Sequence, residues 1–580
     1  MANMSKRSVR FVSVASVALI AVYFLVGYLD NADSASGQQN LWKRSEQDIL
    51  RRQDDEAADA DDGFVPFPES DCPRFTDYAN TTHPPFSDGP LKLPYQRPDD
   101  RCRTFYSPIV EKVIEEFKKK IEDPDLARLF ENTFPNTLDT TIRWHVNNTD
   151  DNKGPRSFII TGDINAEWIR DSRAQLYNYQ ELAPYDKKLQ NLILGAINQQ
   201  VEFVTKYPYC NAFQPPASAN LKPGSNGQEV QVKPEINHDE IWECKYEIDS
   251  ISSFFGLSTD YYEATGDGSF INDAWIKAAE TEIKTIREQQ TPTFAPNGTL
   301  NPVYYSFESK TWVSTGTLSL EGAGNPVNNN TNLIKSQFRP SDDSSIYPFF
   351  IPGNAQAVAE LKRAAAMLKK EGHKSLANEM NDIAKKVEKD IWEYGTYDHP
   401  VFGEVFAFEV DGYEGRLFMD DANIPSLLTL PDVGFLNMDD ETYQNTRKMI
   451  FSAKGNPYYV EGEHFKGIGG PHAGIAYAWP MSQIGRIRTT DDDDEIKEAL
   501  KLLKNSTSGL GLMHESINVF EPPGPNSFTR PWFAWVNTEF ARSIIDVAQR
   551  KPHLIFKNDE KLTLDDIGKK YGGNTEDSDD

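Results

Sequence analysis

The sequence has no excess of positive charge. Its 580 residues include 60 Lys and Arg against 88 Asp and Glu, which gives a formal net charge of −28 at pH 7. Proteins that bind nucleic acids need a basic surface to neutralise phosphates. The net negative charge therefore argues against a nucleic-acid partner. It excludes few other functions.

Signatures of several enzyme classes are also missing. The four cysteines match no zinc-binding spacing, and His472 and His514 lie too far apart in the chain to resemble a metal-ligand pair. The chain has no G-x-S-x-G nucleophile elbow and no phosphate-binding loop with Gly-Lys-Ser/Thr. We therefore expect no metal and no cofactor. A hydrolase that uses a pair of carboxylates remains the simplest enzyme class.

One long apolar run stands out, near the N-terminus. Residues 11–28 contain no charged side chain and reach the length of a membrane span. Basic residues precede the run, so the bulk of the chain should be lumenal or extracellular. We predict a cytoplasmic tail at 1–10, a transmembrane signal anchor at 11–29, and a single-pass type II membrane protein of the Golgi or ER. A cleaved signal peptide is the alternative.

Composition divides the remainder of the chain into four parts. Residues 30–62 are polar and charged, which predicts a disordered stem. Residues 63–104 are rich in Pro, Asp and Asn and should wrap the domain surface as irregular chain. We expect the main globular domain at 105–555 and an acidic C-terminal tail at 556–580.

The four cysteines allow three disulfide pairings. For an oxidising compartment we expect Cys72–Cys102 and Cys210–Cys244. Asparagines of the glycosylation pattern N-x-S/T should lie on exposed loops, and some should be glycosylated. Beyond the apolar run these asparagines are Asn80, Asn147, Asn297, Asn329 and Asn505.

Apolar residues recur at helical spacing through most of the globular part. The predicted helices cover 113–134 with a break at Asp123-Pro124, 167–181, 187–206, 248–265, 271–289, 355–370, 375–395, 421–430, 440–453, 473–486, 493–504 and 533–549. Only short segments such as 157–162, 291–307 and 405–413 favour strands. Helices in successive pairs with long Gly/Pro/Asn loops indicate a mainly α toroid of helical hairpins, with its chemistry in loops at one end. An open helical solenoid is the alternative.

Two stretches carry the residue types of a sugar site. The first, 511–540, places His514 and Glu515 beside a Pro/Gly-rich loop, followed by Arg530 and several aromatic residues. Indole faces stack on sugar rings, and charged side chains bind hydroxyl groups. The second stretch, 242–250, supplies the second carboxylate that a glycoside hydrolase needs.

Other predicted helix starts also combine acids with Arg, Trp and Pro. Helix capping is the simpler explanation for Asp342, Asp420 and Asp421 taken singly. Capping alone, however, does not require Arg and Trp beside the acid at several successive junctions. The recurrence favours a functional site built from these loops.

The motifs TGDINAEWIRDS, KYEIDS, FRPSDDSSIYPFFIPGNA, MDDANIPSLL, GIGGPHAG, MHES and FTRPWFAW occur in this order. Together they resemble glycoside hydrolase family 125, over about residues 105–550. The resemblance implies an (α/α)6 barrel catalytic domain at 105–555 and an inverting exo-α-1,6-mannosidase without a metal requirement. Its partner would be a mannose-containing glycan.

The resemblance also implies roles for individual residues. Asp249 in KYEIDS would be the general acid and Glu515 in MHES the general base. The residues expected to bind the sugar are Arg170, Asp171, Asp343, His514, Arg530 and Trp532.

An inverting mechanism sets geometric expectations. The two carboxyl groups should face one pocket, ~6.5–9.5 Å apart, to leave room for a water. The pKa of Asp249 should be raised by burial or by a nearby acid such as Glu247, and Arg170 or Arg530 should contact one of the acids.

Two other functions remain open. Departures from the family pattern at Asn165, Ser252 and Ile517 suggest a glycan-binding protein with a degenerate site. A glucosidase of the same helical-toroid type is the third possibility.

Overall fold

The computed structural model describes residues 72–149, 154–311 and 313–572, all within the second of two compact units, residues 59–580. The predicted cytoplasmic tail, signal anchor and stem at 1–62 lie outside these residues. Within the described ranges, no helix has the length and apolarity needed to cross a membrane.

Helices make up most of the regular structure. The α-helices are α2 (Phe75–Ala79), α3 (Pro108–Lys120), α4 (Pro124–Thr133), α5 (Asn136–Thr140), α6 (Ile169–Tyr177), α7 (Lys187–Lys206), α8 (Ile248–Thr265), α9 (Asp273–Gln289), α10 (Ile351–Lys370), α11 (Lys374–Tyr394), α12 (Glu441–Ile450), α13 (Pro480–Arg488), α14 (Asp493–Asn505), α15 (Ala534–Arg550) and α16 (Leu564–Tyr571). The 3₁₀-helices are η2 (Asp100–Cys102), η3 (Gln180–Tyr185), η4 (Ala217–Ala219) and η5 (Pro552–Leu554).

Side-chain caps explain where many helices begin. Asp123 accepts hydrogen bonds from the first N–H groups of α4, and Pro124 occupies the first turn, so the predicted break is confirmed. Asp186 caps α7 and Asn272 caps α9 in the same way. These polar caps satisfy N–H groups that have no partner inside the helix.

Two predicted helices are wrong in whole or in part. Residues 421–430 form turns, because the Asp420 carboxylate accepts the N–H groups of Leu427 and Leu428, and Pro425 has no N–H to donate. The helix expected at 473–486 begins only at Pro480. The residues before it form a turn and a short strand.

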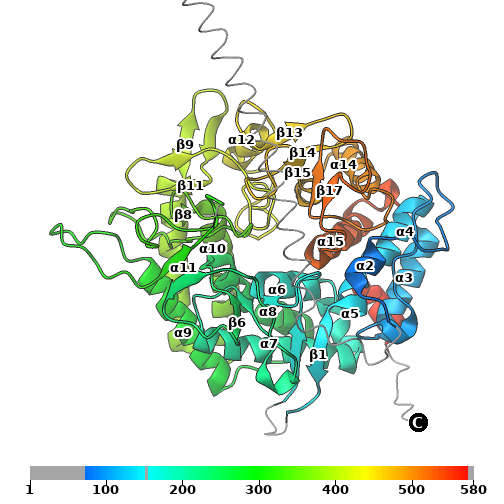
Figure 1. Ribbon diagram of the computed structural model, residues 1–580, viewed down its shortest axis with the longest axis horizontal. Helices are drawn as coiled ribbons and strands as arrows, with labels where there is room; N and C mark the ends of the chain where they lie inside the picture. The colour runs from blue at the N-terminus through cyan, green and yellow to red at the C-terminus, as the bar shows by residue number, and fades with distance from the viewer. Residues whose placement is uncertain (1–71, 150–153, 312, 573–580) are drawn as a thin grey trace, which may run out of the picture. The chain divides into compact units, whose positions relative to one another are not determined.

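Helices follow one another around a ring in Figure 1. Helices α6, α8, α10, α13 and α15 are buried on nearly all sides, whereas α9, α11, α12 and α14 bury one face and expose the other. Along the inner set, α13 contacts α15, α15 contacts α6, α6 contacts α8 and α8 contacts α10. The sequential pairs α10–α11 and α13–α14 pack against each other, in agreement with the predicted toroid of helical hairpins, whereas α9 packs against α7. The described residues are thus mainly helical, as expected.

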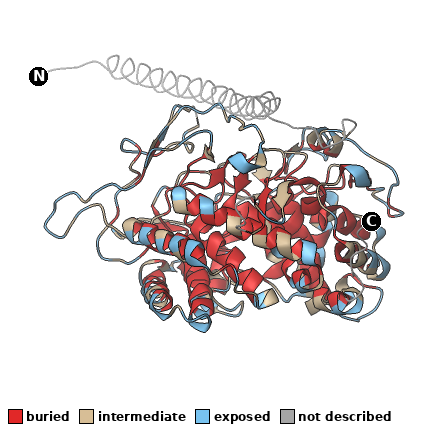
Figure 2. Cartoon of the chain, turned by 90° about the horizontal axis from the view of Figure 1, so that it is seen from below, coloured by how far each residue is buried: buried red, intermediate tan, exposed pale blue. Residues whose placement is uncertain are grey.

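The strands are short and pair in small antiparallel sheets. They are β1 (Ile142–Val146), β2 (Arg156–Ile159), β3 (Glu167–Trp168), β4 (Ala212–Phe213), β5 (Val230–Lys233), β6 (Ile241–Glu243), β7 (Ser306–Ser309), β8 (Phe349–Phe350), β9 (Thr396–His399), β10 (Gly403–Phe406), β11 (Glu409–Val410), β12 (Arg416–Leu417), β13 (Tyr459–Glu461), β14 (Lys466–Ile468), β15 (Tyr477–Ala478), β16 (Ser516–Asn518) and β17 (Phe528–Thr529). Figure 2 shows strands and loops gathered at one end of the helices.

Two of these sheets fix the starts of inner helices. In the sheet β3-β4-β6, β3 leads directly into α6, and β6 precedes α8. In the sheet β15-β16-β17, β15 precedes α13, and β17 precedes α15. Pairing between strands therefore holds four helix starts in register at the loop end.

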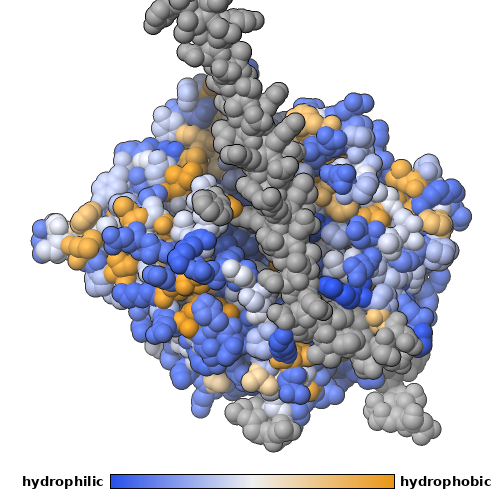
Figure 3. Space-filling model, viewed as in Figure 1, coloured by the Kyte–Doolittle hydropathy of each residue, from blue (hydrophilic) through white to orange (hydrophobic). Residues whose placement is uncertain are grey.

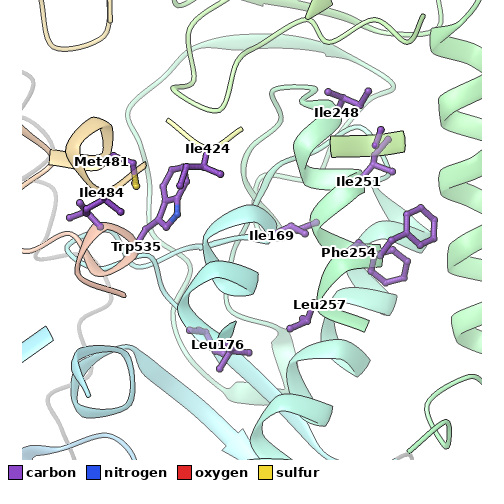
Figure 4. Close-up of a cluster of buried hydrophobic side chains, with 14 of the residues drawn as sticks. Ile169, Leu176, Ile248, Ile251, Phe254, Leu257, Ile424, Met481, Ile484 and Trp535 are labelled. Carbon is purple, nitrogen blue, oxygen red and sulfur yellow. The ribbon is translucent and has the colours of Figure 1, made fainter. Parts of the chain in front are cut away.

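The hydrophobic core joins the inner helices. In Figure 4, Ile169 of α6, Ile248 and Phe254 of α8, Met481 of α13 and Trp535 of α15 converge from separate elements. All five side chains are buried. At roughly 25 cal/mol per Å² of apolar surface removed from water, this burial is the main term that stabilises the ring.

The two ends of the described chain meet beside α3. Ile121 forms a bridge with Phe556, and the Glu122 N–H donates to the Ile555 carbonyl at 2.9 Å. Helix α16 lies in the stretch expected to be an acidic tail, yet it contacts α3 and η3. Helix α15 contacts α4 and α5, so the last helix of the ring packs against the first ones.

Both expected disulfides are present, Cys72–Cys102 and Cys210–Cys244. The asparagines of all five glycosylation patterns are exposed. The face shown in Figure 3 is mostly hydrophilic with scattered hydrophobic groups, as the charge composition predicts.

Candidate active site

A pocket of about 40 Å³ lies at the loop end of the ring. Residues from six separate stretches of the chain form its wall. They are Thr161, Ile164, Trp168, Arg170, Asp171, Pro340, Ser341, Asp342, Asn423, His472, Trp479, Glu515, Arg530, Phe533 and Trp535. All of them except Trp479 belong to the seven motifs singled out in the sequence.

Arg170 and Asp171 reach the pocket from the first turn of α6. The Thr161 hydroxyl donates to the Asp171 carboxylate, and the Arg170 guanidinium lies 4.9 Å from the centre of the Trp535 ring. Arg170 is buried and surrounded by acids, with Glu247 at 3.0 Å and Asp249 at 3.6 Å. This cluster of opposite charges holds the guanidinium at the pocket wall.

Glu515 lines the pocket just before β16, and both of its carboxyl oxygens have donors. The Thr529 hydroxyl donates to Oε2 at 2.9 Å, and Arg530 Nη1 donates to Oε1 at 3.3 Å. Asp163 accepts from Arg530 Nε at 3.0 Å with each of its oxygens. Arg530 has φ +52°, a conformation that a non-glycine residue adopts at a cost. The predicted base is therefore oriented by two neighbours.

Asp249 lies in the first turn of α8, behind Arg170, and is not among the residues that line the pocket. Within the part of the chain that the structure describes, neither carboxyl oxygen accepts a hydrogen bond from another residue. Burial raises the pKa of Asp249 to about 6, although Arg170 acts in the opposite direction. Burial is thus the main cause of the shift, as expected.

Asp342, for which helix capping was the simpler explanation, lines the pocket, whereas the neighbouring Asp343, one of the expected sugar-binding residues, does not. Asp342 has φ +66°, and its carboxylate lies 3.8 Å from Arg170. Asp343 lies 3.8 Å from the ring of His472, another lining residue. Burial lowers the pKa of His472, but Asp343 and then Glu515 raise it to about 9, so this imidazole is protonated at neutral pH.

His514 and Trp532 do not line the pocket. The His514 ring lies between the carbonyls of Thr507 and Arg530 and stacks on Phe528 at 3.8 Å. Burial lowers the pKa of His514 to about 4, so the ring stays neutral and supports the loop.

Trp532 points toward the N-terminal wrap. Its indole N–H donates to Asn136 at 3.3 Å, and its ring meets Phe75 edge-on at 4.8 Å.

Three other indoles form the pocket wall. Trp168, Trp479 and Trp535 line it; none is among the expected sugar-binding residues, although Trp535 belongs to the aromatic cluster of the 511–540 stretch. Their ring N–H groups are buried without a hydrogen-bond partner among the residues of the described ranges. Each tryptophan stands directly before or at the start of an inner helix, and that position is the signal that could have identified them.

The structure therefore brings together Arg170, Asp171, Glu515 and Arg530 in one pocket, with Asp249 and Asp343 directly behind lining residues. Both arginines contact an acid, as predicted. The expected separation of the two catalytic carboxyls stays a prediction. Among residues 72–149, 154–311 and 313–572, no three His, Cys, Asp or Glu side chains are placed to hold a metal ion.

Two carboxyl groups of different environment beside one pocket can perform acid–base chemistry. Asp249 is a buried carboxyl with a raised pKa, and Glu515 is a hydrogen-bonded carboxyl at the pocket surface. Such a pair separates the acid role from the base role. Unpartnered indole N–H groups and cationic side chains add donors for hydroxyl-rich ligands.

Comparisons with known proteins point the same way. Residues 123–545 match the family described as metal-independent alpha-mannosidase (GH125). The meiotically up-regulated gene 157 protein of Schizosaccharomyces pombe is 51% identical over 489 residues, which cover 84% of this chain and 94% of that protein. A Streptococcus pneumoniae metal-independent alpha-mannosidase, solved as a non-productive complex with alpha-1,6-mannobiose, has 30% identity and a TM-score of 0.68. That match covers 76% of this chain and 99% of the bacterial one.

Proposed function

Because the chain belongs to the GH125 family of metal-independent α-mannosidases, we propose that it releases mannose from non-reducing α-1,6-linked ends with inversion of configuration. Asp249 is the general acid and Glu515 the general base. The bacterial relative was solved with alpha-1,6-mannobiose, which supports this linkage as the first to test.

The environment of Asp249 is the observation that carries the proposal. A general acid must hold its proton near neutral pH, and a pKa of about 6 allows this for a substantial fraction of molecules. Asp342 lines the pocket but is less suited to the role of general acid. Lys245 and Arg170 outweigh the effect of burial and lower its pKa. Asp249 lies 3.6 Å from Arg170, which forms part of the pocket wall.

Glu515 is placed to hold the attacking water. Its oxygens accept one hydrogen bond each from Thr529 and Arg530, and a carboxylate oxygen has a further lone pair for a water proton. An inverting enzyme uses such a carboxylate to deprotonate water on the face of the sugar opposite the leaving group. The strained Arg530, fixed by Asp163, keeps that carboxylate in position.

Mannose recognition follows from the rest of the wall. The free indole N–H groups of Trp168, Trp479 and Trp535 supply donors for sugar hydroxyls, and their faces suit the apolar side of a pyranose ring. The protonated His472 adds a charged donor.

Hydrolysis of α-1,6-mannobiose by the purified full-length protein tests the proposal. Proton NMR of the first product should show β-mannose, and Asp249→Asn and Glu515→Gln should each lower kcat by ~100-fold or more. An α-configured first product would contradict inversion. Mannoside binding without turnover would identify a glycan-binding protein, and turnover of glucosides alone would identify a glucosidase.

We also propose that the protein is a type II membrane protein with its catalytic domain in the lumen of the secretory pathway. Two disulfides and five exposed glycosylation asparagines support an oxidising compartment. Protease protection of the domain in sealed microsomes is the expected result. Digestion of the domain in intact microsomes would refute this orientation.

A further inference from the structure

A second and larger cavity, of about 350 Å³, lies between α12, the β13–β14 hairpin, α13 and α14. It shares no residue with the pocket described above. Its lining residues are Gln444, Arg447, Lys448, Phe451, Tyr459, Lys466, Gln483, Arg486 and Glu495. Trp479 of the first pocket and Arg486 of this cavity are separated by ~10 Å of helix, at 1.5 Å per residue.

The polar face of α12 lines one side of the cavity. Gln444, Arg447 and Lys448 stand at positions i, i+3 and i+4, the spacing of one helix face, and Phe451 follows directly after the helix. The opposite face of α12 is the buried one. The helix thus presents two cations to the cavity.

The ion pairs of the cavity leave positive charge uncompensated. Arg447 Nη2 and Arg486 Nε share one oxygen of Glu495, each at 2.7 Å. Arg486 Nη2 and Lys466 share Glu498, at 2.8 Å and 2.6 Å.

The cavity is lined by four cations, Arg447, Lys448, Lys466 and Arg486, and by one acid, Glu495. Two further acids, Glu498 and Glu461, lie beside Lys466. A net positive cavity is distinctive in a chain of net charge −28.

The acids at this cavity remain ionised, so the count of charges holds. Burial raises the pKa of Glu495, but the hydrogen bond from Arg447 and the contacts with Arg486 lower it below its usual value. Arg447 Nε is buried and has no partner among the described residues. The guanidinium planes lie over Phe451, at 5.3 Å and 5.7 Å from its centre, and this stacking fixes their orientation.

We propose that this cavity binds a phosphate group, free or as a monoester. Guanidinium groups fixed by ion pairs and stacking match the oxygens of a tetrahedral anion, and Lys448 and Lys466 add point charges. A phosphate monoester carries roughly 1.5 to 2 negative charges at neutral pH, and the mainly cationic lining of the cavity complements that charge. The site goes beyond the proposed glycosidase function, so either can fail without the other.

Isothermal titration of the full-length protein tests the site, with inorganic phosphate in one arm and glucose 6-phosphate in the other. We expect one anion per chain with Kd in the low millimolar range or tighter, weakened as ionic strength rises. Unesterified glucose is the neutral control. Stronger binding of the monoester would identify an esterified ligand, and equal binding would identify phosphate itself.

Variants locate the site. Lys448→Gln should weaken phosphate binding by ~5-fold, and Lys448→Gln with Lys466→Gln by ~20-fold or more, while mannobiose hydrolysis stays unchanged. Lys454→Gln removes the same charge from a nearby exposed position outside the cavity and should have less than a ~2-fold effect. Binding weaker than about 50 mM in the wild type, or equal losses in the Lys448 and Lys454 variants, would overturn the proposal.

Discussion

Asp249→Asn should change both the stability of the fold and catalysis, because the same buried carboxyl contributes to both. The two effects can be measured separately. Burial raises the Asp249 pKa from 3.8 to about 6. In the folded protein this acid keeps its proton over a pH range where the unfolded chain has released it. Stability therefore falls as pH rises through the window from about 4 to 6, and stays lowered above it.

The magnitude follows from the size of the shift. Each pKa unit corresponds to ~1.4 kcal/mol, so ionised Asp249 costs the folded state about 3 kcal/mol at neutral pH. Between about pH 4.5 and pH 7.5 the change amounts to ~2 kcal/mol. Asn carries no charge, so the variant should lack this loss. The cost of burying its amide is the same at both pH values and cancels from the difference.

Urea unfolding followed by tryptophan fluorescence at the two pH values measures this difference. Asp249→Asn should gain ~2 kcal/mol on the wild type as pH rises from about 4.5 to 7.5, while kcat on α-1,6-mannobiose falls ~100- to 10,000-fold. Asp343→Asn is the matched control, and its effect on the pH dependence of stability should have the opposite sign. Burial raises the pKa of Asp343, but His472 lowers it by more. A pH-independent difference for Asp249→Asn would refute the account of its burial.

Three further predictions concern the same site. The kcat/KM of the wild type should fall as pH rises through about 6, because Asp249 must be protonated to act; a profile flat to pH 8 would exclude it as the acid. Arg530→Lys keeps the charge but loses the paired contacts with Asp163, so kcat should drop ~10- to 100-fold with little change in Tm, and Asp163→Asn should match it. Joint replacement of Cys210 and Cys244 by Ser should cost ~4 kcal/mol, given their separation of 34 residues, and a loss below ~1 kcal/mol in urea unfolding would contradict that estimate.

Sequence patterns predicted most helices because spacing and caps agreed. Helices α7 and α8 begin and end where periodicity placed them. The failure at 421–430 came from a carboxylate, Asp420, that satisfies backbone N–H groups a helix would otherwise have used. Helix propensity does not reveal a side chain that takes the place of helical hydrogen bonds in this way.

The site was predictable at the level of loops and less so at the level of neighbouring side chains. The structure places Arg170, Glu515 and Arg530 in the wall of one pocket, and their roles stay predictions. The motifs favoured Asp343 over Asp342, but Asp342, with a backbone φ of +66°, is the one that lines the pocket. Such a conformation has no signature in an Asp-Asp pair.

A similar ambiguity affects the tryptophans. Trp532 and Trp535 are three positions apart, yet only Trp535 lines the pocket. A change from strand to helix between them sets their directions, and its position was uncertain by a few residues from the sequence.

The pocket is built from residues near both ends of the domain, so it cannot be complete until the C-terminal part has been synthesised. Asp163 pairs with Arg530, which is 367 residues further along the chain and is therefore synthesised later. At 5–20 residues per second, a ribosome needs roughly 20–70 seconds to supply it. During that interval the Cys210–Cys244 disulfide can already form, whereas the carboxylate of Glu515 has not yet been made. A nascent chain therefore stays unable to cleave glycans around it until its final helix has left the ribosome and docked.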